Sequence, residues 1–355
     1  MNPEKNFSPK NISSSVKKAA LIISLSLVGM STTTVISAIL GYDAFFPRYE
    51  RPDYSLYPGM YCYERFEGSL PRKTLKVRSG ENDLAAYYYP VEEPKGLCVI
   101  VHGIHAGADD YLPLIEAVTK GGYAVFAYDV TGTYSSEGDG GIGMCQQLVD
   151  LDRVLDYLKD TKPYKDMPKL LIGHSWGVYA AGSVLALHGE VKAYVGIAPM
   201  CDGTTVMADK AEEYVDKLVE PVRPIFNAYQ KHLFGDYTKY NGVVGINSTD
   251  IPVLIAQGLD DTNIPYDTLS ITAKLDEITN PNVEVYYGKD LQGTHTGIWH
   301  SAEAEKYAKQ VKSKVKGMSD EEKAEFYKTV DHRLYSDVNP ELTELIFKTF
   351  EKGLK

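Results

Sequence analysis

Short apolar segments rich in β-branched residues alternate with amphipathic segments from Pro71 to the end of the chain. This alternation is typical of strands joined by crossover helices in a mostly parallel sheet. The predicted strands cover residues 73–79, 83–91, 96–103, 123–130, 169–175, 191–199, 251–258 and 283–289, with a hairpin turn at 79–82 between the first two. Most of them are apolar throughout, which indicates that both faces of the sheet are covered.

Helices are predicted between and after these strands, at residues 110–120, 146–160, 176–188, 266–279, 301–330 and 340–351. The pattern is clearest at 146–160, where leucine and valine recur every three or four residues. That spacing leaves Asp150, Asp152, Arg153 and Asp156 for the solvent. The chain therefore predicts one α/β domain over residues 71–355, with helices on both faces of its sheet.

Two segments exceed what such a domain needs. Residues 200–250 predict a helical lid, and residues 301–337 predict an extra charged helical segment that serves as a partner surface or a second lid. Apolar residues of the lid form its own core or line a pocket: they are Val206, Met207, Tyr214, Leu218, Val222, Ile225, Phe226 and Leu233.

The N-terminal region predicts a membrane anchor. Residues 19–42 carry no charge and are long enough as a helix to span a bilayer. Lysines before them predict that residues 1–18 stay in the cytoplasm and that the folded domain lies outside. The alternative is a cleaved signal peptide and a secreted domain. Residues 43–70 are rich in aromatic side chains and predict an irregular connector that packs on the domain or lies at the lipid headgroups.

Composition argues against several classes of function. The formal charge is −11 and no basic stripe is present, so nucleic acid is not an expected partner. Cysteines occur at 62, 98, 145 and 201, without a C-x-x-C pair or zinc-like spacing to histidine, so neither a metal nor a cofactor is expected. Cys98 lies inside a predicted strand as a small core residue. The disulfide state of Cys62, Cys145 and Cys201 stays open.

A G-x-S-x-G motif at Gly173–Gly177 joins a predicted strand to a predicted helix. The motif alone is weak, but a strand–turn–helix context is that of a nucleophile elbow, which exposes the serine hydroxyl on a strained turn. The helix N-terminus also directs backbone N–H groups toward a developing oxyanion. Ser175 is therefore the candidate nucleophile.

A nucleophilic serine needs a histidine base and a carboxylate that orients it, here in the chain order Ser, Asp, His. Asp261 and His295 each follow a predicted strand, at the edge where sites of open α/β sheets form. Asp260 and His300 are the rival acid and base, but order and position favour Asp261 and His295.

Backbone N–H groups complete the predicted site. Ile104, in the loop after the strand at 96–103, and Trp176 are the expected oxyanion donors. His102 and His105 could be interpreted as a metal pair, but their i, i+3 spacing on a loop without a carboxylate disfavours this.

From Pro71 onward the sequence resembles the α/β-hydrolase superfamily, and within it the monoacylglycerol lipase, lysophospholipase and serine aminopeptidase-like group. The resemblance rests on residues 101–138, 172–177, 258–265 and 293–297. It implies an α/β-hydrolase fold with a lid insertion, here preceded by one transmembrane helix. The sequence departs from the family's usual pattern at Thr131, Tyr134 and Val178, where arginine, glycine and glycine are usual.

The resemblance implies a serine hydrolase that cleaves carboxylic esters through an acyl-enzyme, with a lipid-like or small acyl ester as substrate. One alternative is an aminopeptidase of the proline iminopeptidase kind, with Asp209, Glu212 and Glu213 of the lid holding an amine. An acyltransferase on the same triad is another. A non-catalytic binding module is the least expected.

Overall fold

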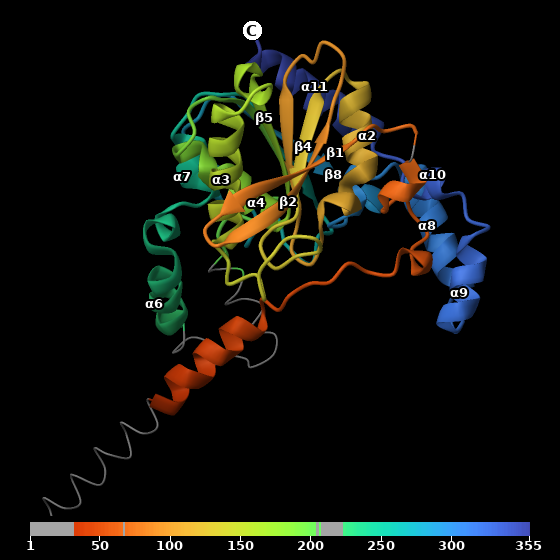
Figure 1. Ribbon diagram of the computed structural model, residues 1–355, viewed down its shortest axis with the longest axis horizontal. Coiled ribbons are helices and arrows are strands. Elements are labelled where there is room, and N and C mark those ends of the chain that lie inside the picture. Colours follow the sequence, from red (N-terminus) through yellow and green to blue (C-terminus); the bar gives the residue numbers. More distant parts are fainter. Residues whose placement is uncertain (1–31, 67, 204–205, 207–222) are drawn as a thin grey trace, which may run out of the picture.

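The computed structural model describes residues 32–66, 68–203, 206 and 223–355. Its centre is an eight-stranded sheet in the order β1-β2-β4-β3-β5-β6-β7-β8 (Figure 1). The strands are β1 Lys73–Ser79, β2 Asn82–Tyr89, β3 Leu97–Val101, β4 Ala124–Tyr128, β5 Lys169–His174, β6 Val191–Ile197, β7 Val253–Gly258 and β8 Val283–Gly288. The pairs β1–β2 and β2–β4 are antiparallel and the other five are parallel. The eight predicted strands and the mostly parallel sheet are confirmed.

Helices cover both faces of the sheet. The α-helices are α2 Leu112–Lys120, α3 Gln146–Asp160, α4 Trp176–Ser183, α6 Arg223–Phe234, α7 Gly242–Asn247, α8 Ala302–Lys314, α9 Asp320–Tyr327, α10 His332–Tyr335 and α11 Pro340–Gly353, and another helix covers residues 32–44. Short 3-10 helices are η1 Tyr54–Leu56, η2 Tyr63–Phe66, η3 Ala108–Tyr111, η4 Tyr164–Asp166, η5 Val184–Ala186, η7 Gly235–Lys239, η8 Ile271–Glu277, η9 Asp290–Gln292 and η10 Gly297–Trp299.

The core is divided by the sheet into two layers. Helices α3 and α4 pack on one face, and α2 and α11 pack on the other (Figure 1). Side chains of β3 alternate between the two layers, with Val99 and Val101 on the α3 side and Cys98 and Ile100 on the α2 side. Cys98 is thus the core residue that its strand position predicts, and all four cysteines are free thiols.

Residues 266–279 differ from the prediction, because they contain no α-helix. The segment forms η8, which begins after Ser270 and has a non-helical residue at Lys274. Ser270 Oγ accepts a hydrogen bond from the Thr272 backbone N–H at 3.0 Å, and Thr272 Oγ1 donates to the carbonyl of Tyr266 at 2.6 Å. Such local side-chain bonds to the backbone compete with α-helical hydrogen bonding.

Helix α3 has the predicted range, but two of the aspartates assigned to the solvent are buried. Asp150 accepts hydrogen bonds from Ser79 Oγ at 2.6 Å and from the Thr131 backbone N–H at 2.8 Å. Asp152 pairs with His188 Nε2 at 3.0 Å. The helical period of a sequence identifies only the apolar positions that face the core. It could not reveal that polar groups elsewhere in the chain bind Asp150 and Asp152.

The N-terminal prediction of a membrane span lies mostly outside the described residues. No helix in the part of the chain that the structure describes is long and apolar enough to cross a bilayer. The end of the predicted span is packed on the domain: Tyr42 is fully buried, its Oη accepts from the Met144 backbone N–H at 3.0 Å, and its ring lies 5.9 Å from that of Phe226. Tyr42 therefore belongs to the folded domain.

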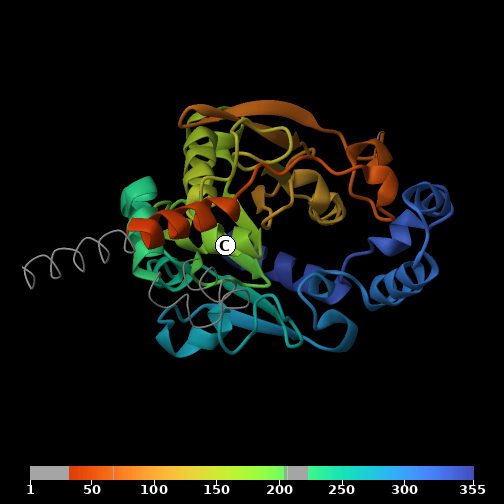
Figure 2. The ribbon, with the colours of Figure 1, turned by 90° about the horizontal axis from the view of Figure 1, so that it is seen from below.

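Residues 43–70, the connector, cross the carboxyl edge of the sheet from the N-terminal helix to the region of α8 and α10 (Figures 1 and 2). Isolated bridges join Pro47 to Gly140 and Tyr49 to Thr133. Phe66 and Leu70 are buried in the core on the α2 side. The connector is thus part of the domain surface around the site.

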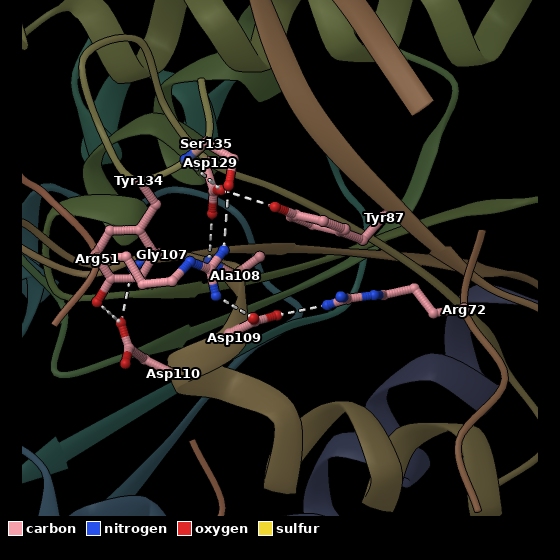
Figure 3. A network of polar contacts seen from close by, with 10 residues as sticks. All are labelled: Arg51, Arg72, Tyr87, Gly107, Ala108, Asp109, Asp110, Asp129, Tyr134 and Ser135. Carbon is pink, nitrogen blue, oxygen red and sulfur yellow. Dashed lines mark hydrogen bonds and ion pairs between the residues drawn. The ribbon is translucent and has the colours of Figure 1, made fainter. Parts of the chain in front are cut away.

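A buried ionic network fixes the connector (Figure 3). Asp109 of η3, with a side chain 1% exposed, is paired with Arg51 and also with Arg72, the latter at 2.7 Å. Asp129, after β4, accepts from the Ala108 backbone N–H at 2.9 Å and from Tyr87 Oη at 3.0 Å. Burial raises the pKa of Asp129 to about 6.

Two helical additions flank this core. The predicted lid contains α6, η7 and α7, but Met207, Tyr214, Leu218 and Val222 lie outside the described residues. Phe226, on α6, packs in the core with Tyr42. Residues 301–337 contain α8, α9 and α10, which share a small apolar cluster of their own.

Candidate active site

Ser175 lies on a strained turn between β5 and α4. Its backbone has φ 56° and ψ −118°, a conformation that residues other than glycine rarely adopt. The two glycines of the motif are required by close approach: a Cβ on Gly177 would lie 2.1 Å from the Val101 carbonyl oxygen, and one on Gly173 would lie 2.5 Å from the Gly177 oxygen. The local sequence therefore builds the strained strand–turn–helix that the motif predicts, and Ser175 remains the candidate nucleophile.

His295 and Asp261 meet across two loops. Nδ1 of His295 donates to Oδ2 of Asp261 at 2.7 Å, and the Asp261 side chain is fully buried. Its other oxygen accepts from the backbone N–H groups of Asn263 and Ile264, both at 2.9 Å. Because Nδ1 carries the proton in this bond, neutral His295 keeps Nε2 free to accept one.

The rival residues have other neighbours. His300 Nδ1 is hydrogen-bonded to Glu305 Oε1 at 2.9 Å. The Asp260 carboxylate lies against Gly293, where an added Cβ would be 2.5 Å from its Oδ2. The structure thus brings Asp261, and not Asp260, onto His295.

Two cavities meet at Ser175, and Ile104, Asn263 and His295 also line both. One cavity, of about 320 Å³, is mostly apolar and is lined in addition by Phe45, Phe46, His105, Met144, Trp176, Met200, Val206 and Ile264. The other, of about 390 Å³, is more polar and is lined in addition by Tyr57, Tyr61, Gly103, Ala106, Asp110, Tyr111, His174, Thr296, Trp299, His300, Glu305, Ala308, Lys312 and Tyr335. A substrate bound at the serine would thus have a separate space on each side of it.

The predicted oxyanion residues flank Ser175. Val101 of β3 is paired with Gly173 of β5, so the loop that carries Ile104 leaves the sheet beside the elbow. A Cβ on Gly103 would lie 3.3 Å from the Ser175 Cβ, which shows how closely this loop approaches. Trp176 is the first residue of α4, and its indole N–H donates to the Met144 carbonyl at 2.9 Å.

The histidines of the loop after β3 do not form a metal pair. His102 Nδ1 donates to the Gly103 carbonyl at 2.7 Å, and Nε2 accepts from the Val130 backbone N–H at 3.0 Å. Burial lowers its pKa to about 4, so His102 is neutral and fixes the loop. Among the described residues, no group of three potential metal ligands is found.

Departures from the family pattern have local explanations. Tyr134 has φ 43°, a conformation that favours the usual glycine. Its Oη donates to Asp110 Oδ2 at 2.6 Å and its ring stacks on Tyr49, so the side chain helps to hold the connector. Thr131 Oγ1 donates to Asp150 at 3.0 Å. Val178 is fully buried in the core.

Several residues around Ser175 were missed by sequence reasoning. The connector supplies Phe45 and Phe46 to the apolar cavity, and Tyr57 and Tyr61 to the polar one. Their aromatic composition was visible in the sequence. Their position at the site was not, because it depends on how the connector crosses the sheet edge.

Comparisons with known proteins agree with this architecture. A family model described as serine aminopeptidase, S33, matches residues 92–251, which include Ser175 but end before Asp261 and His295. No curated protein matches the sequence significantly.

Solved structures share the fold at low identity. The Pyrococcus furiosus esterase Pf2001 is 20% identical over 76% of this chain and 96% of its own, with a TM-score of 0.54. Est1E of Butyrivibrio proteoclasticus, solved with ferulic acid bound, is 16% identical over 79% of this chain and 100% of its own, with a TM-score of 0.53. TT1662 of Thermus thermophilus is 13% identical over 81% and 98%, with a TM-score of 0.52. The strand order and these structural matches show that the chain has the α/β-hydrolase fold.

Proposed function

We propose that the protein is a serine hydrolase that cleaves carboxylic esters. His295 removes the proton of Ser175, Asp261 stabilises the resulting imidazolium, and the N–H groups of Ile104 and Trp176 bind the oxyanion. The acyl-enzyme is then hydrolysed by water that His295 activates. The observation that carries the proposal is the 2.7 Å hydrogen bond between His295 and Asp261 beside a serine on a strained turn.

We assign one part of the ester to each of the two cavities. The polar cavity contains Thr296, Trp299 and His300, which follow His295 in its own loop. A leaving alcohol must take its proton from His295, so we place the alcohol there. The acyl group then occupies the apolar cavity of Phe46, Met144 and their neighbours. An apolar acyl chain on a polar alcohol, as in a monoacylglycerol or lysophospholipid, suits this division.

An aminopeptidase is the second candidate, because the matching family model describes serine aminopeptidases. An aminopeptidase must hold the substrate's free amino group on the acyl side of the scissile bond. Among the described residues, the carboxylates that line the cavities are Asp110 and Glu305, on the leaving-group side, and the acyl side has none. Asp209, Glu212 and Glu213 lie outside the described residues. The described walls therefore favour an ester. An acyltransferase would use the same triad with another acceptor.

Turnover of p-nitrophenyl esters of rising chain length, compared with proline amides, tests the proposal. We expect faster turnover of the esters and an optimum at an acyl length that fits the apolar cavity. Faster turnover of the amides would favour the aminopeptidase instead. The Ser175→Ala variant is the control, because it removes the nucleophile and leaves the cavities in place.

A location outside the cytoplasm is a further proposal that rests on the uncharged sequence of residues 19–42. Because Tyr42 is fully buried, cleavage just before Asp43 would remove a core side chain. This favours retention over cleavage at that point. N-terminal sequencing of the mature protein tests whether Tyr42 is retained. A mature chain that begins beyond Tyr42 would contradict retention.

A further inference from the structure

A chain of hydrogen bonds connects three segments of the candidate site. The backbone N–H of Gly103, in the loop after β3, donates to Tyr111 Oη at 2.9 Å. Tyr111 Oη lies 2.7 Å from His174 Nδ1, and His174 Nε2 lies 3.2 Å from the backbone carbonyl oxygen of His295. Gly103, Tyr111 and His174 are all buried.

The donors in this chain follow from the chemistry of its ends. A backbone N–H can only donate, so Tyr111 Oη accepts from Gly103 and gives its own proton to His174 Nδ1. His174 then carries its proton on Nε2 and donates it to the carbonyl of His295. Each polar atom along the path has a matching partner, and only one tautomer of His174 satisfies the chain.

The protonation state supports this arrangement. Burial, with a smaller contribution from the neighbouring His295, lowers the pKa of His174 to about 3. His174 is therefore neutral at any pH near neutrality. The hydrogen-bond chain keeps its direction over the whole range in which a serine hydrolase works.

We propose that Tyr111 and His174 are positioning residues that hold the oxyanion loop and the catalytic histidine in fixed places relative to Ser175. The inference rests on the proposed function. Gly103 directly precedes Ile104, the proposed oxyanion donor, and His174 directly precedes Ser175. The hydrogen-bond chain thus connects the oxyanion loop, the nucleophile turn and the loop of the base.

The size of the expected effect follows from how geometry limits rate. A misplacement of about 1 Å at a reacting centre can cost on the order of 100-fold in rate. Loss of the Tyr111 hydroxyl would leave the Gly103 N–H and His174 Nδ1 without their buried partner, and both loops would be free to shift. Substrate binding in the two cavities would change little, because Tyr111 Oη spends its hydrogen bonds on the protein.

Tyr111→Phe is a clean variant for this test. The ring is retained, and with it the stacked contact with Trp299 at 5.9 Å. Tyr237→Phe is the matched control, because it removes another hydrogen-bonded hydroxyl, which donates to Asp152 at 2.6 Å and lines neither cavity. His174→Gln provides a second route: its amide nitrogen can still donate toward His295, but Nδ1 is lost.

The experiment measures kcat and KM for the best p-nitrophenyl ester, with melting temperature and circular dichroism as checks of folding. For Tyr111→Phe we expect kcat to fall by about 10- to 100-fold, with KM changed by less than about threefold. Tyr237→Phe should keep the kcat of the unaltered protein. Both variants break the hydrogen bond between Tyr111 and His174. The kcat of the double variant Y111F/H174Q should therefore be no more than about twofold below that of the less active single variant.

Three results would overturn the inference: a folded Tyr111→Phe protein with kcat within twofold of the unaltered one, a loss confined to KM, or losses in the double variant that multiply. If Tyr111→Phe fails to fold, His174→Gln decides, and unchanged kcat in it contradicts the proposal. An unaltered protein that is folded but turns over no ester contradicts the proposed function itself, whereas an active protein insensitive to both variants contradicts only the positioning role.

Discussion

The ring of Phe46 lies 6.2 Å from the ring of Trp176, so a residue of the N-terminal connector packs on the residue that follows the nucleophile. Phe46 is 6% exposed and forms one wall of the apolar cavity. The indole of Trp176 is in turn held by the Met144 carbonyl, and the Met144 N–H by Tyr42. The segment before the sheet is therefore a structural part of the proposed acyl site.

Phe46→Ala should enlarge the apolar cavity. We expect the preferred acyl chain to become longer by a few carbons and kcat/KM for the original best ester to fall by about tenfold, since each buried methylene is worth about 0.8 kcal/mol. The free energy of unfolding should fall by about 3 kcal/mol. Activity on an ester series and urea unfolding measure both effects. Phe347→Ala is the control, because it removes a ring stacked on Tyr123 away from the site. It should destabilise the protein without changing the preferred acyl chain length. An unchanged chain-length preference in Phe46→Ala would refute the assignment of the acyl group to the apolar cavity.

Asp109→Asn tests the buried ionic network. The substitution leaves Arg51 and Arg72 near a neutral group, and breaking a buried ion pair costs about 3 kcal/mol or more. Urea unfolding should show this loss. Asp83→Asn, whose partners Lys76 and Arg78 are exposed, should change stability much less, because solvent screens exposed ion pairs. Equal effects of the two substitutions would mean that the network does not anchor the connector.

His188 should make stability depend on pH. Burial opposes its charge, but hydrogen bonds to Asp152 and Glu190 outweigh burial and raise its pKa, while the pKa values of both carboxyls are lowered. The stabilisation is complete below the unfolded pKa of about 6.5 and is lost as pH rises through the raised folded pKa. The melting temperature of the unaltered protein should therefore fall from pH 6 to pH 9 more than that of His188→Gln. Parallel curves for the two proteins would argue against a charged His188.

Asp261→Asn tests the orienting role of the carboxylate. Its amide cannot stabilise the imidazolium and favours the wrong tautomer of His295, and the comparable change in other triads lowers kcat by about 10⁴-fold. We expect a loss of at least 10³-fold in kcat with little change in KM. Asp260→Asn, one residue away and not bonded to His295, is the control. A larger loss in Asp260→Asn would exchange the two assignments.

The sequence predicted those parts of the fold that depend on local pattern. The strands follow from apolar runs, α3 from its period of three to four, and the Ser–Asp–His order from known elbow chemistry. The prediction of an α-helix at residues 266–279 was wrong, because the Ser270 and Thr272 side chains form hydrogen bonds with the local backbone. The helical pattern placed Asp150 on the solvent side. Its burial could not be predicted, because its partners come from β1 and from the loop after β4.

The residues that surround Ser175 could not be predicted, because they come from distant parts of the chain that only the folded structure brings together. Nothing in the spacing of Tyr42, Phe46 or Tyr57 indicates that the connector crosses the edge of the sheet where Ser175 lies. Tyr111 lies 64 residues before Ser175 in the chain, and its hydroxyl reaches His174 only because β3 and β5 are neighbours in the sheet. Sequence reasoning proposes which residues carry the chemistry, but it could not identify those that surround them.

Labelling with a fluorophosphonate probe, which reacts covalently with activated serines, tests most directly whether Ser175 is a nucleophile. We expect that the unaltered protein is labelled at Ser175, that Ser175→Ala is not labelled, and that His295→Ala is labelled far more slowly. Folded, unaltered protein that shows no labelling dependent on Ser175 would contradict the proposal of a serine hydrolase.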